Sequence, residues 1–174
     1  MEENPYQSPV VAVASPIPST ERYSSIGGWL VLIGIGIVFT PVKLLIVLLT
    51  IHRPLFTQGT IVVLMDPAHP NYHPLFVPLV VFEVIVNVVF IVWSTGNIYW
   101  FFGRRRFFPA VFITFVSVSL GVMFLDLVLM NMIPFIAASN DLSQLKEVIQ
   151  SIVAACIWIP YFLVSKRVKG TFTR

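Results

Sequence analysis

Long apolar runs, separated by short polar stretches, dominate the chain from Ile26 to Val164. Apolar side chains occur on all sides of each run when it is projected as a helix, whereas a strand of a membrane barrel alternates apolar and polar residues. Each run is long enough to cross the hydrocarbon layer of a bilayer, about 30 Å thick, as a helix. The pattern predicts an all-α membrane protein, a bundle of four transmembrane helices over residues 26–49, 76–102, 108–133 and 145–164.

The composition places these helices in lipid. Hydrophobic residues make up 57% of the chain and charged residues 11%, and the mean hydropathy is +0.88, values that are untypical of a water-soluble domain. A length of 174 residues suffices for one helical bundle, so we expect one transmembrane domain over residues 25–165. The single cysteine, Cys156, lies inside the fourth run and is expected to be a small buried side chain.

The two ends of the chain differ from this central region. Residues 1–24 contain four prolines and no helical period, which predicts a disordered tail. Glu2 and Glu3 stand where a secretory signal carries basic residues, so we expect no cleaved leader. Residues 166–174 predict a basic tail that binds anionic lipid headgroups.

Lysine and arginine are concentrated between the second and third helices and after the fourth. The clusters are Arg104–Arg106 and Lys166–Lys169, whereas the opposite loops contain only Arg53 and Lys146. Positively charged loops stay in the cytoplasm, so both termini and the 103–107 link are predicted to be cytoplasmic. The formal net charge of +3 then indicates contact with anionic lipid, and we expect no nucleic acid as a partner.

Three charged side chains lie inside the apolar runs, of which the fourth begins at Val148: Lys43, Glu83 and Asp126. A charge near a helix centre costs about 2.5–3.5 kcal/mol on insertion scales, so such residues are usually paired or functional. A rise of about 1.5 Å per residue places all three at similar depth in the outer part of the membrane. Lys43 is predicted to pair with Glu83 and to leave Asp126 as a candidate proton-handling acid, unless Lys43 and Asp126 reach the outer interface separately.

Polar residues of the 76–102 helix form one stripe, because at about 100° per residue they fall within an arc of roughly 80°. The stripe consists of Glu83, Asn87, Ser94 and Asn97. We expect Lys43, Glu83, Asn87 and Asp126 to form an intramembrane polar cluster. Such a stripe either lines a water-filled path or supplies hydrogen bonds between helices, and both interpretations stay open here.

One face of the first helix carries Gly36, Thr40 and Lys43, a small-xxx-small spacing that lets a neighbouring helix approach closely. Pro41 and Pro160 each remove one helical hydrogen bond, which predicts bends in the first and fourth helices.

Residue types suited to metal binding occur in the 52–75 loop, at Asp66, His69 and His73. Prolines between them prevent a regular helix from presenting both histidines on one face. The sequence also lacks a glycine-rich phosphate loop, a His-Glu metal helix and a nucleophile elbow. We therefore expect no metal, no cofactor and no enzymatic activity.

Short motifs at both ends of the helical region resemble a known family. The first helix begins Gly27-Gly28-Trp29 and contains Pro41, and the chain closes with Tyr161 and Ser165-Lys166-Arg167-Val168-Lys169. This pairing resembles a bacterial inner-membrane family known as domain of unknown function 2569, over roughly residues 26–172. The resemblance implies a small multi-helix bundle in a bacterial inner membrane, and it implies no substrate, cofactor or catalytic residue.

Two functional hypotheses follow. The first is a non-enzymatic accessory or assembly component that acts through helix–helix contacts with a membrane-protein partner or a second copy. The alternative is a small proton- or ion-coupled transporter or channel subunit that uses Glu83 and Asp126. Acids that face an aqueous cavity would favour the alternative, and acids that face each other and Lys43 would favour the first.

Overall fold

The computed structural model describes residues 26–139 and 142–173, and every regular element in that part of the chain is helical. The first membrane-spanning helix runs from Trp29 to Thr57. It comprises α1 (Trp29–Val47), one π-helical turn, η2 (Leu48–His52), and α2 (Arg53–Thr57). The other long helices are α4 (Phe76–Phe102), α5 (Phe108–Asn131) and α7 (Ser143–Val164), and the short ones are α3 (Thr60–Leu64), α6 (Pro134–Ala137) and α8 (Lys166–Thr171).

The predicted fold class is confirmed, because four helices are long and apolar enough to cross a membrane. The first helix differs most from its predicted bounds, since it continues to Thr57 instead of ending at residue 49. The polar residues around His52 suggested a loop, yet His52 is buried and the π-helical turn carries the helix through them. The tail predicted over residues 1–24 lies outside the described residues.

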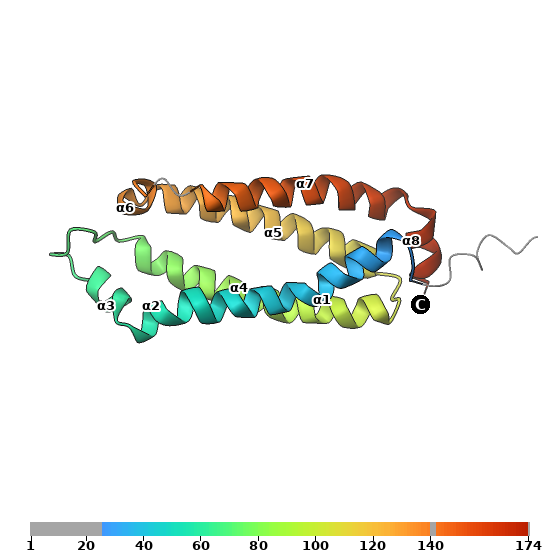
Figure 1. Ribbon diagram of the computed structural model, residues 1–174, viewed down its shortest axis with the longest axis horizontal. Helices are drawn as coiled ribbons and strands as arrows, with labels where there is room; N and C mark the ends of the chain where they lie inside the picture. Colours follow the sequence, from blue (N-terminus) through green and yellow to red (C-terminus); the bar gives the residue numbers. More distant parts are fainter. Residues whose placement is uncertain (1–25, 140–141, 174) are drawn as a thin grey trace, which may run out of the picture.

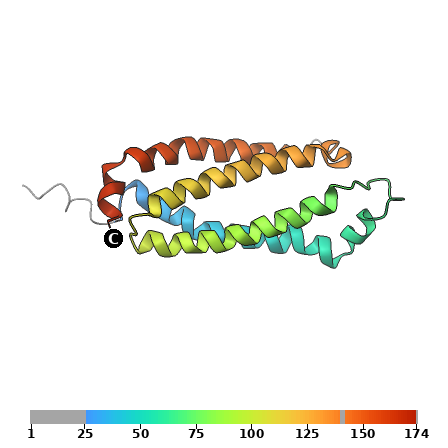
Figure 2. The same ribbon diagram turned by 180° about the vertical axis from the view of Figure 1, so that it is seen from behind.

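Two helix pairs form the bundle (Figure 1). Helix α1 packs against α4, α5 packs against α7, and the contact between α4 and α5 joins the pairs. Seen from behind, α5 lies between α7 and α4 (Figure 2). One end of the bundle carries α8 and the 103–107 link, and we call it the tail end; the other carries α3 and α6, and we call it the loop end.

Aromatic side chains fill the tail end. The buried core there consists of Leu30, Ile33, Ile37, Phe101, Phe108, Phe112, Phe162, Val168 and Phe172. The rings of Phe112 and Phe162 lie 4.6 Å apart and join α5 to α7. The ring of Phe172 lies 4.9 Å from Phe108 and 5.8 Å from Phe101, so Phe172 is part of the tail-end core.

The C-terminal segment therefore differs from the simple basic tail predicted over residues 166–174. The Ser165 hydroxyl accepts a hydrogen bond from the Val168 backbone amide and starts α8, a normal role for an N-cap serine. Val168 and Thr171 are buried, while Lys166 and Lys169 stay exposed. Apolar side chains on one face of α8 anchor it to the core and leave its lysines outside.

A second apolar cluster closes the loop end. It consists of Ile61, Leu64, Phe76, Leu79, Val80 and Ile133. The rings of Phe76 and Phe135, whose centroids lie 5.5 Å apart, bring α4 into contact with α6. Because α6 follows α5, this contact is a further link between the two helix pairs.

Candidate functional site

A polar network near the loop end contains one side chain from each of the four long helices. His52 comes from the first helix, Glu83 from α4, Asp126 from α5 and Gln144 from α7. His52 Nε2 lies 3.2 Å from Glu83 Oε2, and Gln144 Nε2 donates to Asp126 Oδ2 at 2.9 Å. The carboxyl groups of Glu83 and Asp126 are close enough to interact electrostatically. We call these four residues the carboxyl network.

His52 is the most enclosed titratable member of the network. Its side chain is 6% exposed, and Nδ1 is buried without a hydrogen-bond partner in the described part of the chain. With a proton on Nε2 the imidazole donates to Glu83.

The predicted pairing of Lys43 with Glu83 is wrong. Lys43 Nζ lies 3.8 Å from Glu147 Oε2, and the two side chains are 70% and 57% exposed. Glu83 contacts His52 and Asp126 instead. Of the predicted polar cluster, the structure therefore brings Glu83 and Asp126 together, and it places Lys43 on the surface, where its long chain reaches a carboxylate on α7.

The polar stripe of α4 faces the interior of the bundle. Asn87, Ser94 and Asn97 are all buried, and Glu83 is mostly covered. Ser94 donates to the Ile91 carbonyl within its own helix. The Oδ1 atoms of Asn87 and Asn97 are buried and have no hydrogen-bond partner among the described residues, so the stripe forms fewer interhelical bonds than its composition permits.

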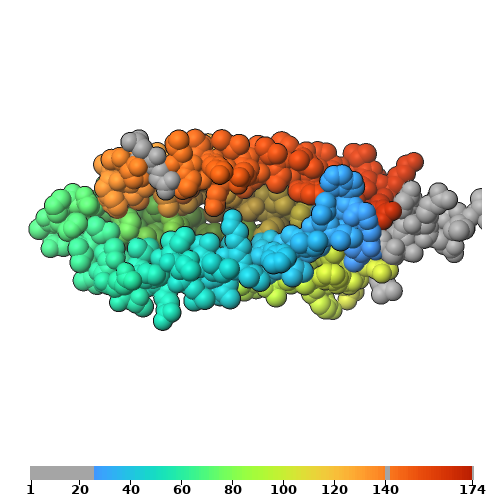
Figure 3. All heavy atoms as spheres, in the orientation of Figure 1, coloured from blue at the N-terminus to red at the C-terminus, as the bar shows by residue number. Residues whose placement is uncertain are grey.

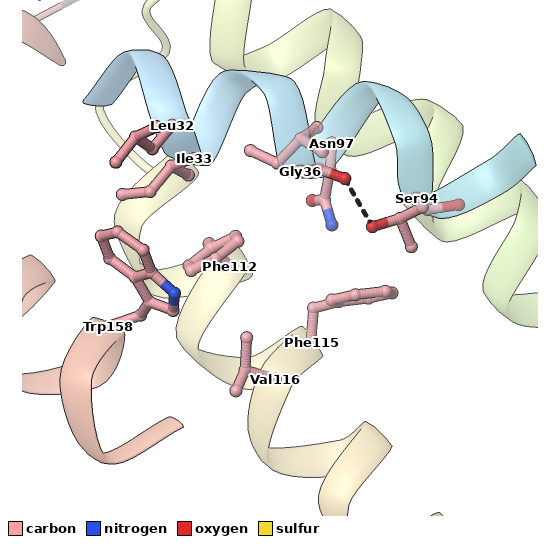
Figure 4. A pocket seen from close by; sticks show the side chains of 11 residues that line it. Leu32, Ile33, Gly36, Ser94, Asn97, Phe112, Phe115, Val116 and Trp158 are labelled. Atoms are coloured by element: carbon pink, nitrogen blue, oxygen red, sulfur yellow. Dashed lines mark hydrogen bonds between the residues drawn. The ribbon is translucent and has the colours of Figure 1, made fainter. Parts of the chain in front are cut away.

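A cavity of about 200 Å³ lies between the two helix pairs, and Ser94 and Asn97 form its polar side. Figure 4 shows the aromatic rings of Phe112 and Phe115 from α5 near Asn97, and the indole of Trp158 from α7 across the pocket near Ile33. The rest of the lining comes from Val116 of α5 and from five residues of α1: Leu32, Ile33, Gly36, Ile37 and Thr40. In the space-filling view a hollow separates α1 from α7 and leaves α5 and α4 visible behind them (Figure 3). We call this hollow the α1–α7 seam.

His52 and Gln144 were absent from the predicted polar cluster. His52 lies beyond residue 49, where the first helix is expected to end, and Gln144 lies one residue before the expected bounds of the fourth helix, 145–164. Both positions depend on helix ends, which local sequence specifies poorly. The apolar character of the 26–49 run gave no signal that a π-helical turn would extend the helix.

The loop histidines cap turns instead of converging. His69 Nδ1 accepts from the Asn71 amide at 3.1 Å, and His73 Nδ1 accepts from the Leu75 amide at 3.3 Å. Asp66 accepts from the Ala68 amide in the same way. Within residues 26–139 and 142–173 no group of three metal-ligating side chains comes together.

Cys156 on α7 is exposed, so the expectation of a buried thiol is wrong. The face of α7 that carries Cys156 points out of the bundle.

The motifs from the two ends of the chain meet at the tail end. A Cβ atom added at Gly27 would lie 2.6 Å from a guanidinium nitrogen of Arg167, and Gly28 adopts a φ of +58° beneath the same guanidinium group. The rings of Trp29 and Trp158 lie 6.2 Å apart, and the ring of Tyr161 lies 6.0 Å from that of Trp158. The Gly-Gly-Trp start and the Ser-Lys-Arg-Val-Lys end therefore form one contact region, although about 140 residues separate them in the sequence.

Comparison with known protein families identifies one family whose match includes both motifs. No curated protein and no solved structure matches the chain. The family described as "Protein of unknown function (DUF2569)" matches residues 23–173, which include every transmembrane helix and α8. The chain therefore belongs to the DUF2569 family.

Proposed function

We propose that the protein is a non-enzymatic accessory or assembly component of a bacterial inner membrane, which acts through helix–helix contacts with another membrane protein. The observation that carries this proposal is the α1–α7 seam. On its α1 side, a Cβ atom added at Gly36 would meet no heavy atom of the described chain within 4 Å. The small-xxx-small face of α1 is thus left uncovered by the described helices.

A transmembrane helix of a partner fits the chemistry of this seam. The Thr40 hydroxyl donates to the Gly36 carbonyl at 2.8 Å, which leaves a small surface with little polarity that a neighbouring backbone can approach. A polar side chain on the partner would also supply a donor to Asn97 Oδ1, which is buried and lacks one among the described residues. A lipid acyl chain would fill the space but offers no such donor.

Purification from native membranes in a mild detergent tests this contact. The wild-type protein should retain a stoichiometric membrane-protein partner, and Gly36→Leu should lose it because the new side chain fills the seam. Gly121→Leu on α5 is the matched control, since Gly121 also has no heavy atom of the described chain within 4 Å of an added Cβ. A monodisperse monomer with no partner, or equal loss in both variants, would contradict the proposal; a homo-oligomer disrupted by Gly36→Leu would make a second copy the occupant.

The same proposal includes a cytoplasmic position for both termini. It is supported by the arrangement of the basic clusters, since the 103–107 link and α8 lie together at the tail end (Figure 1). Basic residues collected at one end of a bundle favour the side with anionic lipid and cytoplasm. A periplasm-active phosphatase should be inactive when fused after Arg174 and active when inserted near His69, and the reverse pattern would refute this orientation.

The alternative, a proton- or ion-coupled transporter subunit, has less support. Glu83 and Asp126 face each other, and the cavity at the seam has no member of the carboxyl network in its lining. A conducting path from the seam to the carboxyl network would have to continue past Asn87, which does not line the cavity at the seam. Ion flux into proteoliposomes that Glu83→Gln abolishes would favour the transporter alternative.

A further inference from the structure

We propose that the end of α4 and the 103–107 link bind the headgroup of an anionic phospholipid, in a pocket between Tyr99 and Arg105. The pocket has a volume of about 480 Å³, and its lining consists of Ile98, Tyr99, Phe102, Gly103 and Arg105. It lies at the tail end, where the link joins α4 to α5 (Figure 2). It shares no lining residue with the cavity at the α1–α7 seam, so this site and the proposed partner contact stand or fall separately.

The backbone of the link holds Arg105 against the end of α4. The Arg104 amide donates to the Phe101 carbonyl at 3.0 Å, and the next amide, that of Arg105, donates to the Trp100 carbonyl at 3.1 Å. These are the two hydrogen bonds of a Schellman motif, in which the residue with positive φ is usually glycine. Here that residue is Arg104, with a φ of 53°, whereas Gly103 before it has a φ of −71°. The chain thus accepts backbone strain at an arginine, and such strain often accompanies a functional site.

Gly103 keeps the pocket open. A Cβ atom added at this position would lie 2.9 Å from the Tyr99 carbonyl oxygen and 3.8 Å from Arg105 Cγ. Because Gly103 also lines the pocket, a side chain there would take up part of its volume. The glycine therefore leaves room between the tyrosine and the arginine for a ligand.

The lining matches the chemistry of a phospholipid. The planar guanidinium group of Arg105 is suited to a phosphate, and the Tyr99 hydroxyl can donate a further hydrogen bond. Ile98 and Phe102 offer apolar surface to the first part of the acyl chains. Tyr99 is 65% exposed, and Trp29, also at the tail end, is 61% exposed. Exposed tyrosine and tryptophan side chains are typical of the headgroup level of a bilayer, which places the pocket at the depth of the lipid phosphates.

The distribution of charge favours an anionic lipid. The acidic residues in the described ranges all lie in the half of the bundle nearer the loop end: Asp66, Glu83, Asp126 and Glu147. Within those ranges no carboxylate side chain lies at the tail end to neutralise Arg105. A zwitterionic headgroup would bring its own positive charge to this basic region, and inorganic phosphate would leave the apolar side of the pocket without a partner.

Native mass spectrometry of the full-length protein, stripped of lipid in detergent, tests the site. The probe is dioctanoyl phosphatidylglycerol, compared with dioctanoyl phosphatidylcholine and with inorganic phosphate. The wild-type protein should bind phosphatidylglycerol in preference to both. Arg105→Gln should weaken the tightest phosphatidylglycerol binding roughly tenfold, because a charge-assisted hydrogen bond is lost. Arg106→Gln is the matched control and should change this affinity little, since Arg106 is exposed and does not line the pocket.

A conservative variant provides a second measurement. Tyr99→Phe removes only the hydroxyl and should weaken phosphatidylglycerol binding roughly threefold. The melting temperature without lipid should stay unchanged in Tyr99→Phe and Arg105→Gln, because both side chains are exposed. Equal weakening by Arg105→Gln and Arg106→Gln would overturn the proposal, since binding would then reflect diffuse attraction to the basic end. Equal binding of phosphatidylcholine, or displacement of the lipid by inorganic phosphate, would also overturn it.

Discussion

Glu83 connects two other members of the carboxyl network, because its carboxyl group contacts His52 and interacts electrostatically with Asp126. Truncation of this side chain would leave the His52 Nε2–H without its acceptor in a partly buried site. An unsatisfied buried polar group usually costs more than the hydrogen bond it lost, since water cannot replace the partner. The consequence of a change at Glu83 therefore depends on whether the new side chain can still form hydrogen bonds.

Glu83→Ala should lower the free energy of unfolding by about 1–3 kcal/mol, because it leaves buried partners unpaired. Glu83→Gln should cost much less, since the amide can accept from His52 and donate to Asp126. Thermal unfolding in a mild detergent, followed by circular dichroism, provides the comparison. Glu147→Ala is the control on an exposed carboxylate, and an equal loss in all three variants would argue that the carboxyl network does not stabilise the fold.

At the scale of the element, two glycines show that α1 has two different faces. A Cβ atom at Gly34 would lie 2.9 Å from the ring of Phe101, so this glycine allows α1 and α4 to pack closely. Gly36, two positions later, faces the α1–α7 seam, where an added Cβ meets no described atom within 4 Å. One face of the helix therefore builds the bundle and another is left free for contacts outside it.

Gly34→Leu should destabilise the isolated protein by about 1–3 kcal/mol, because overpacking forces Phe101 or the α1 backbone to move. Gly36→Leu should be neutral or slightly stabilising, since leucine has a higher helix propensity than glycine by roughly 0.8 kcal/mol. The two melting temperatures in detergent test this difference. A large loss of stability in Gly36→Leu would mean that the seam is closed in solution.

At the scale of the whole molecule, separate contacts join the helix pairs at the two ends. The carboxyl network and the α4–α6 contact lie at the loop end, and the aromatic core with α8 lies at the tail end. Between them the seam leaves the middle of α1 and α7 apart (Figure 3). Because membrane helices gain little from hydrophobic burial, such local contacts decide how the bundle is held together.

Phe172→Ala should cost about 3 kcal/mol, because Phe172 is 5% exposed and its ring joins Phe101 and Phe108 in the tail-end core. The expected result is a lower melting temperature and easier proteolysis of α8 in detergent. Phe102→Ala is the matched control, since Phe102 is 55% exposed. If the two variants lost the same stability, α8 would not be part of the core.

The sequence by itself determined the fold class, the number of spans and the inward direction of the α4 stripe. These properties follow from the length of each apolar run, from its composition and from the fixed angle between successive residues of a helix. They require no knowledge of which helices are neighbours. The motifs at the two ends were also visible in the sequence, although nothing in it stated that Gly27 and Arg167 touch.

Only the tertiary structure decided which polar side chains meet. Similar depth suggested Lys43 as the partner of Glu83, but depth leaves the rotation and the order of the helices unspecified, and a long lysine side chain can reach several neighbours. The π-helical turn brought His52 to Glu83, and the position of α7 brought Gln144 to Asp126. The carboxyl network and the open seam depend on how four helices pack, and helix packing is set by contacts between residues far apart in the sequence.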